Sequence, residues 1–100
     1  MIRGTTPTHV FTLPFDTSLV KTLQIIYKQK SDVMLTKGNE DCMLEGDTVT
    51  VKLTQADTLS FDYSKPVEIQ VRVLTIDAEA LVSNIVRVRV EQCLNDEVLT

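Results

Sequence analysis

Apolar and polar residues alternate one by one in short stretches along this chain, whereas apolar residues spaced three or four apart are scarce. A β-strand points successive side chains to opposite faces, so this alternation is typical of strands with one buried face. The clearest example follows Pro66, where four apolar residues alternate with polar ones (Val67, Ile69, Val71, Val73). The pattern predicts an antiparallel fold, because the strands of a parallel sheet are usually apolar without interruption.

Polar breaks divide the alternating stretches into about seven expected strands. The first two run over about 8–15 and 20–28, and the others begin near Val33, Cys42, Thr48, Val67 and Val86. Pro14 indicates that the first strand lies at a sheet edge, because proline cannot donate a hydrogen bond to a neighbouring strand. Three apolar residues share one face of that strand (Phe11, Leu13, Phe15). The sequence therefore predicts an all-β fold, an immunoglobulin-like antiparallel β-sandwich of about seven strands.

The last third of the chain also predicts a strand register. If the turn after the strand beginning at Val67 is centred between Ala78 and Glu79, the apolar rows of the two last strands face each other. The expected pairs are Ile69 with Val88, Val71 with Val86, and Glu68 with Arg89. A single helical turn is expected after Thr54, because Thr54 and Asp57 have the spacing of a capping box.

Length and composition add that the chain forms one domain over residues 1–100, with a short apolar tail at about 92–100. Tryptophan is absent, so the core is left mainly to Val, Leu and Ile. The net charge of −4 disfavours nucleic acid as a partner, because such binding depends on cations. No apolar run suits a signal peptide or a membrane span, so we expect a soluble protein made in the cytoplasm.

Few residues are candidates for chemistry. His9 is the only histidine, and no activated nucleophile or orienting group is recognisable near it in sequence, so we interpret it as a surface or edge residue. Cys42 and Cys93 are 51 residues apart, and we expect free thiols rather than a disulfide or a zinc site. Glycine-rich phosphate loops and the G-x-S-x-G pattern are both missing.

A group of acidic residues raises the alternatives of a calcium site or a glycosidase carboxylate pair (Glu40, Asp41, Glu45, Asp47). All of them fall on polar turns, where acidic side chains are usually only solvated. The sequence therefore predicts no catalytic residue, no metal ligand, no cofactor and no enzymatic activity.

The carboxyl-terminal tail carries the candidate partner contact, formed by Leu94, Val98 and Leu99. Leu94 and Val98 are four residues apart, so one helical turn would present them together. The tail either docks on a neighbouring subunit, or folds back over its own core, or frays. Sheet edges are a second option for binding, because their unpaired backbone groups can accept a strand.

Three stretches carry a family resemblance: Met1-Ile-Arg-Gly-Thr-Thr-Pro-Thr8, Val49-Thr-Val-Lys-Leu-Thr-Gln-Ala-Asp-Thr-Leu-Ser-Phe61, and Val67-Glu-Ile-Gln-Val-Arg-Val-Leu-Thr75 followed by Ala80-Leu-Val-Ser-Asn-Ile85. Together they resemble short proteins encoded in phage and prophage structural-gene regions of Gram-positive bacteria. The order of strands and turns is also similar to the amino-terminal sandwich domain of phage upper-baseplate proteins. One departure is the turn Ile76-Asp-Ala-Glu-Ala80, where a glycine would be expected.

The resemblance implies a phage or prophage virion structural or assembly protein that acts through protein–protein contacts. Its partners would be other virion or assembly proteins, including further copies of itself, and it would be made in the host cytoplasm and carried into the virion. An inhibitor directed at the host is not separable from this by sequence. The alternative is a small carbohydrate- or peptide-binding module of non-phage origin, which would need exposed aromatic residues, and most aromatic residues here fall on inward positions.

Overall fold

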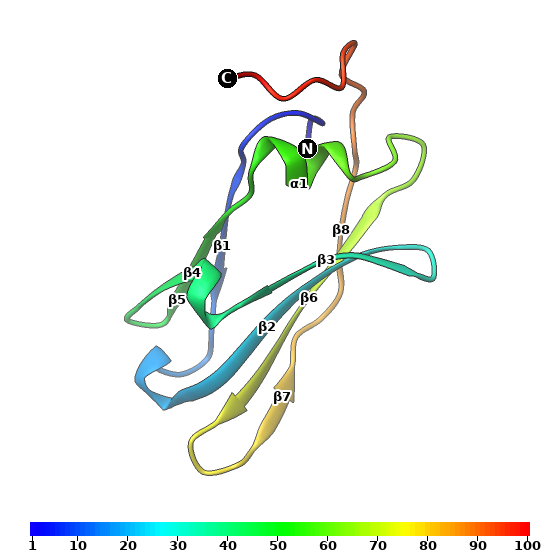
Figure 1. Cartoon of the computed structure of the whole chain (residues 1–100). Coiled ribbons are helices and arrows are strands. Elements are labelled where there is room, and N and C mark those ends of the chain that lie inside the picture. Colours follow the sequence, from blue (N-terminus) through cyan, green and yellow to red (C-terminus); the bar gives the residue numbers. More distant parts are fainter.

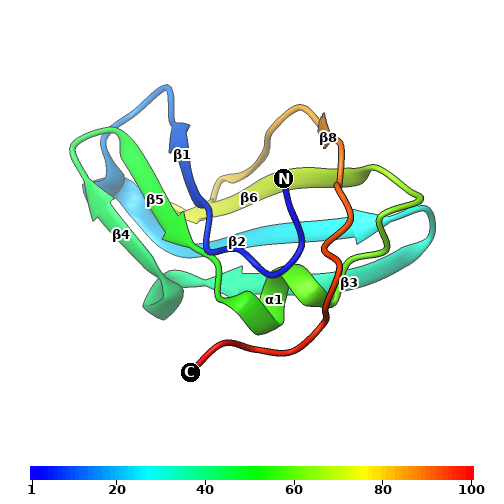
Figure 2. The ribbon, with the colours of Figure 1, turned by 90° about the horizontal axis from the view of Figure 1, so that it is seen from above.

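The computed structural model describes all 100 residues and contains two antiparallel sheets. The smaller sheet has the order β1-β5-β4, with β1 at Thr8–Thr12, β4 at Cys42–Glu45 and β5 at Thr48–Lys52. The larger sheet has the order β3-β2-β6-β7, and β8 also pairs with β6 (β2 Val20–Gln29, β3 Asp32–Gly38, β6 Val67–Thr75, β7 Ala80–Val82, β8 Val86–Val88). Figures 1 and 2 show the two sheets as separate layers, which confirms the expected β-sandwich.

The core lies between the sheets and is built from the alternating rows that the sequence predicted. Ten of the twelve buried apolar residues come from three stretches: Leu23, Ile25 and Tyr27 of β2, Val49, Val51 and Leu53 of β5 and the residue after it, and Val67, Ile69, Val71 and Val73 of β6. Burying a side chain of this size contributes about 1.5–3 kcal/mol. Phe61 and Val90 complete the cluster.

A short helix, α1 (Gln55–Leu59), lies at one end of the sandwich, near both termini (Figure 1). It begins with the expected capping box, because Thr54 Oγ1 accepts the Asp57 N–H at 3.0 Å and Asp57 Oδ2 accepts the Thr54 N–H at 2.9 Å. Thr58 is buried and holds the amino-terminal segment, accepting the Gly4 N–H at 2.9 Å and donating to the Thr5 carbonyl at 2.8 Å. Two 3₁₀ turns, η1 (Thr17–Leu19) and η2 (Asn39–Asp41), complete the helical elements. No helix in the chain has the length and apolar character needed to cross a membrane.

Strand β1 lies at the edge of its sheet, as Pro14 predicted, but it is shorter than expected. It ends at Thr12, because Pro14 has no N–H with which to continue the ladder. Phe11, Leu13 and Phe15 nevertheless all pack against the core, so their shared orientation is confirmed.

The predicted register of the last strands is wrong by two residues, and an additional strand, β7, precedes the strand expected at Val86. Val86 lies opposite Ile69 instead of Val71, and Val88 lies opposite Val67. The observed pairs on β7 are Arg72 with Val82, Val73 with Leu81, and Leu74 with Ala80. The sandwich therefore has eight strands rather than about seven. Glu68 lies opposite Arg87 instead of Arg89, with an ion pair of 3.3 Å.

Two local features cause the shift. The turn after β6 is centred on Asp77, because the Thr75 N–H bonds to the Glu79 carbonyl at 2.9 Å and leaves a three-residue loop. Residues 83–85 then contain one more residue than β6 can pair, so the chain bulges between β7 and β8. The pairing of β8 with β6 is shifted by two residues, which is an even number. The side chains of β8 therefore point to the same faces of the sheet as predicted.

Candidate interaction surface

Three of the sheet edges carry features that hinder pairing with another chain. Proline residues flank β1 (Pro7, Pro14), and β4 is only four residues long. Strand β3 points Lys37 inward, where its Nζ lies 3.0 Å from Asp57 Oδ2, and its pairing with β2 is irregular between Tyr27 and Lys28. Short strands, proline, inward charges and bulges are the usual protections of an edge. These three edges are therefore poor docking sites.

The β7 edge lacks proline and inward charge. From Ala80 to Val86 no residue is charged, and the exposed fraction is 39% for Leu81 and 57% for Val82. Ser83 donates its N–H to the Val71 carbonyl at 2.9 Å, toward β6. Since an antiparallel ladder alternates, Ala80 and Val82 turn their N–H and C=O groups to the open side. Its protections are its length of three residues and the bulge at 83–85.

A groove of about 250 Å³ opens beside this edge, between the two sheets. The segment after β1 supplies one wall with Leu13, Pro14 and Phe15, and β6 and β7 supply the other, including Val73 and Leu81. Most of its lining is apolar. A strand added to β7 would therefore place its inward side chains next to an apolar groove.

His9 lies on the edge strand β1, in line with its interpretation as a surface or edge residue, but its ring faces the space between the sheets. Its Nδ1 lies 2.7 Å from Tyr27 Oη, and its ring is 6.5 Å from the ring of Phe11 in an edge-on arrangement. Burial, helped by the positive amino terminus, lowers the pKa of His9, so the neutral ring is favoured. The structural reason is strand parity, which places His9 on the same face as Phe11.

Other ionisable groups surround this pair. Burial raises the pKa of Tyr27, and the nearby Cys42 and Asp57 raise it further. Burial and Asp41 also raise the pKa of the Cys42 thiol. Partial burial opposes ionisation of Asp57, but the Thr54 N–H and Lys37 outweigh it and lower the pKa of Asp57. A protonated phenol and a neutral imidazole suit a structural hydrogen bond between the two sheets.

Three of the acidic residues considered for chemistry occupy turns, as expected, whereas Glu45 is the last residue of β4. Asp41 Oδ2 accepts the Gly38 N–H at 2.9 Å, and Glu45 and Asp47 flank Gly46 in the β4–β5 turn. No group of three or more His, Cys, Asp or Glu side chains is arranged to hold a metal ion. Cys42 and Cys93 are both free thiols.

The tail folds back over its own domain instead of forming a helix. Asn95 Oδ1 accepts the Glu97 N–H at 2.8 Å, and such a local bond competes with the first turn of a helix. Asp96 pairs with Arg3 at 2.9 Å, and the Gln55 side chain forms two bonds to the backbone of Leu99. Val98 packs beside α1, whereas Leu94 is 99% exposed and Leu99 is 79% exposed. The three residues therefore do not form one shared surface.

Sequence reasoning named sheet edges in general but did not single out β7. A signal was present, because the stretch Ala80–Val86 is an uncharged run that contains four of the exposed apolar residues. Its position at the edge follows from the strand order β3-β2-β6-β7, which the alternation alone did not reveal.

Comparison with known proteins supports the architecture. No family model and no curated protein matches the chain. Among solved structures, the chain is similar to the immunoglobulin-like domain of mouse leukocyte-associated immunoglobulin-like receptor 1, determined as a strand-swapped dimer. The TM-score is 0.56 at 9% identity, over 91% of this chain and 84% of the other. The fold is an immunoglobulin-like β-sandwich.

Proposed function

We propose that this chain is a phage or prophage virion structural or assembly protein that acts through protein–protein contacts, without catalysis. The resemblance in sequence supports the phage origin. The observation that carries the contact is the β7 edge, where Ala80 and Val82 offer unpaired backbone groups beside exposed apolar side chains. The protein would be made in the host cytoplasm and carried into the virion.

The β7 edge suits a partner strand for two physical reasons. Backbone hydrogen bonds to an added strand supply affinity, and pockets for alternate side chains supply specificity. The groove beside Leu13 and Leu81 is such a pocket. The structural neighbour is described as a strand-swapped dimer, which illustrates strand exchange on a sandwich of this kind.

A peptide-binding module of non-phage origin is the second candidate, since the same edge and groove would accept an extended peptide. Carbohydrate binding has less support, because sugar sites usually stack ligands on exposed aromatic rings. Tyr27 and Phe61 are buried, Phe11 and Phe15 are half-buried, and only Tyr63 is largely exposed. A reproducible hit on a glycan array would reverse this ranking.

The proposal is tested in the phage whose genome encodes the chain. We expect deletion of the gene to lower the yield of complete particles, and a plasmid copy of the wild type to restore it. Val82→Lys should fail to restore the yield, because a lysine on an edge strand hinders the addition of another strand. The matched control is Val10→Lys on β1, where the native valine is similarly exposed (61%, against 57% for Val82).

Normal particle yield after deletion would contradict the proposal, as would neighbouring genes of metabolism instead of portal, head or tail genes. Equal rescue by both lysine variants would retain the phage role but remove the β7 edge as the contact. Urea denaturation of both purified variants checks that they are folded.

A further inference from the structure

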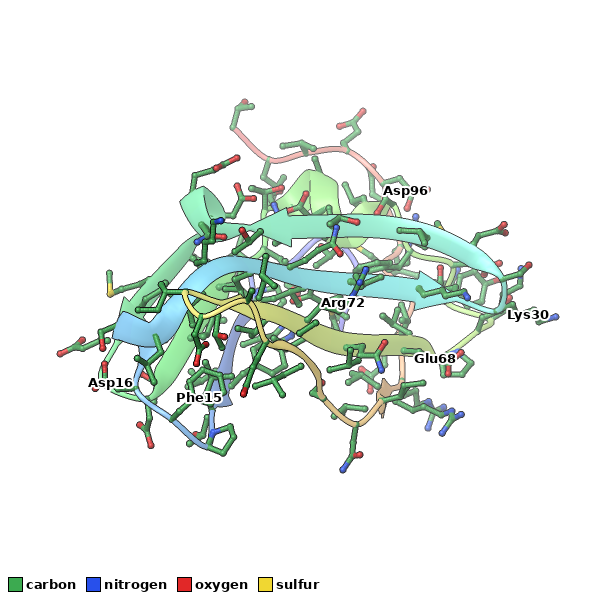
Figure 3. All side chains as sticks on the ribbon, turned by 90° about the horizontal axis from the view of Figure 1, so that it is seen from below. Phe15, Asp16, Lys30, Glu68, Arg72 and Asp96 are labelled. Atoms are coloured by element: carbon green, nitrogen blue, oxygen red, sulfur yellow. The ribbon has the colours of Figure 1, made fainter.

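The two ends of the molecule carry opposite charge. The sandwich is 46 Å long, and Figure 3 shows Phe15 and Asp16 at the end opposite Lys30 and Glu68. We call these ends the acidic pole and the basic pole. Each is assembled from turns that are distant in the sequence.

Three turns form the acidic pole: η1 with the residue before it, the β4–β5 turn and the β6–β7 turn. Hydrogen bonds hold them together, from the Thr17 N–H to the Gly46 carbonyl at 2.7 Å and from the Ile76 N–H to the Leu19 carbonyl at 2.9 Å. These turns contribute acidic side chains but no basic ones (Asp16, Glu45, Asp47, Asp77, Glu79). Leu19 and Ile76 are exposed among them.

The basic pole forms where the β2–β3 turn, the loop 62–66 and β8 meet. The buried Gln29 joins the first two, because its side chain bonds to the backbone of Asp62 (2.7 and 2.9 Å) and to the Lys65 carbonyl (3.0 Å). A hollow of about 320 Å³ then places Lys65 beside Arg87, Arg89 and Tyr63. Lys28 and Lys30 add further positive charge, against Asp32, Asp62 and Glu68. The exposed apolar residues here include Val33, Tyr63 and Val86.

We propose that copies of this chain associate end to end, with the acidic pole of one copy on the basic pole of the next. Each pole combines exposed apolar residues with charged ones, and the net charge is negative at the acidic pole and positive at the basic pole. Such a mixture is the composition of a protein interface with a polar rim. Opposite potentials favour this orientation, and like poles repel. Such a contact is heterologous, so it produces rings or open filaments instead of a closed dimer. This inference is independent of the phage origin and of the β7 edge.

Salt and charge reversal test the contact. Screening lengths fall from about 30 Å at 0.01 M salt to about 3 Å at 1 M. Light scattering should give a mass above twice the 11.2 kDa chain at low salt, growing with concentration and falling to the monomer at high salt. Lys30→Glu/Arg89→Glu and Glu45→Lys/Asp47→Lys should each be monomeric alone. An equimolar mixture of the two should associate again.

The substituted side chains make no ion pair within their own chain, so the fold should tolerate them. Lys52→Glu/Arg72→Glu is the matched control, because it changes the net charge as much as the basic-pole variant but lies on β5 and β6, outside the segments that form the poles. It should associate like the wild type. A zero-length carbodiimide should also link Lys30 to Asp47, which lie at opposite ends of one chain.

A wild type that stays monomeric at low salt overturns the proposal. A mass that stops at the dimer also overturns it, because that indicates a closed contact. Failure of the mixed variants to associate, or loss of association in the control, has the same consequence. Val82→Lys should leave the end-to-end mass unchanged, which separates this contact from the β7 edge.

Discussion

His9 joins the two sheets through its hydrogen bond to Tyr27 Oη. The Tyr27 ring in turn lies 6.0 Å from the ring of the buried Phe61, so this bond reaches into the core. A protonated imidazole between the sheets would lose solvation, which is why burial holds the pKa of His9 below its usual 6.5. The residue is therefore a weak point of the fold in mild acid.

The sign of the pH dependence follows from the lowered pKa of His9. Above 6.5 the histidine is neutral in both the folded and the unfolded chain, so its full contribution is present. As the pH falls below 6.5, the unfolded chain takes up a proton first, and the free energy of unfolding decreases until the folded chain is protonated as well. Urea denaturation at a series of pH values should show this decrease.

His9→Gln is the control, because glutamine keeps a polar group near Tyr27 and does not titrate. In the variant, the free energy of unfolding should no longer decrease just below pH 6.5, but it should still decrease at more acidic pH. That second decrease comes from groups such as Asp57, whose lowered pKa stabilises the fold above 3.8 and ceases to do so as the carboxyl is protonated. An unchanged pH profile in the variant would refute the role of His9.

The β6–β7 hairpin decides how the last strands are arranged. Thr75 stabilises its turn by bonding to the Asp77 carboxylate and by accepting the Glu79 N–H at 3.0 Å. Ala78 has φ of 68°, a left-handed conformation that glycine usually occupies in a three-residue hairpin loop. The sequence lacks the glycine expected in this turn. The structure keeps the expected kind of turn, and Ala78 adopts the strained backbone conformation in place of glycine.

Ala78→Gly should stabilise the protein. A left-handed conformation costs an L-residue roughly 1–2 kcal/mol, and the greater freedom of glycine in the unfolded chain offsets part of that gain. We expect the free energy of unfolding to rise by about 0.5–1 kcal/mol. The midpoint of urea denaturation measures the change.

Ala80→Gly, two residues later on β7, provides the comparison, because its φ is not positive. Glycine in a strand should lower the stability by about 0.5–1 kcal/mol. If both substitutions act in the same direction, strain at Ala78 is not the cause.

At the scale of the molecule, the tail links the carboxyl end to α1 and the amino terminus. Arg3 is central, because its Nη1 binds Asp96 and its Nη2 donates to the Leu59 carbonyl at 2.8 Å. Figure 2 shows the tail passing α1 at the end of the sandwich where the chain begins. The tail therefore binds to its own domain and holds α1 and the amino-terminal segment together.

Removal of residues 94–100 should loosen this end without changing the association state. The lost contacts are largely exposed, so we expect a cost of about 1 kcal/mol and faster hydrogen exchange in α1. Val98→Ser should reproduce part of the loss, whereas Leu94→Ser, at a fully exposed position, should have no effect. A fall in solution mass on truncation would instead indicate that the tail docks on a neighbouring copy.

The sequence by itself determined the class of fold, the inward rows and the cap of α1. Each of these depends on neighbours within a few residues, such as the alternation in β6 or the pair Thr54 and Asp57, so the pattern is visible locally. The sequence also contained the orientation of His9. Residues two apart on a strand point to the same face, so His9 shares the inward face of Phe11, but the interpretation of His9 did not use this spacing.

Only the tertiary structure decided the register of β7 and β8, the path of the tail and the two charged poles. The register depends on the turn centred on Asp77 and on one extra residue at 83–85, which becomes a bulge only when measured against β6. The poles arise because turns separated by tens of residues meet at the same end of the sandwich, and alternation says which face a side chain takes but not which turns become neighbours. Those neighbours follow from the order of the strands, which is fixed by packing across the whole chain.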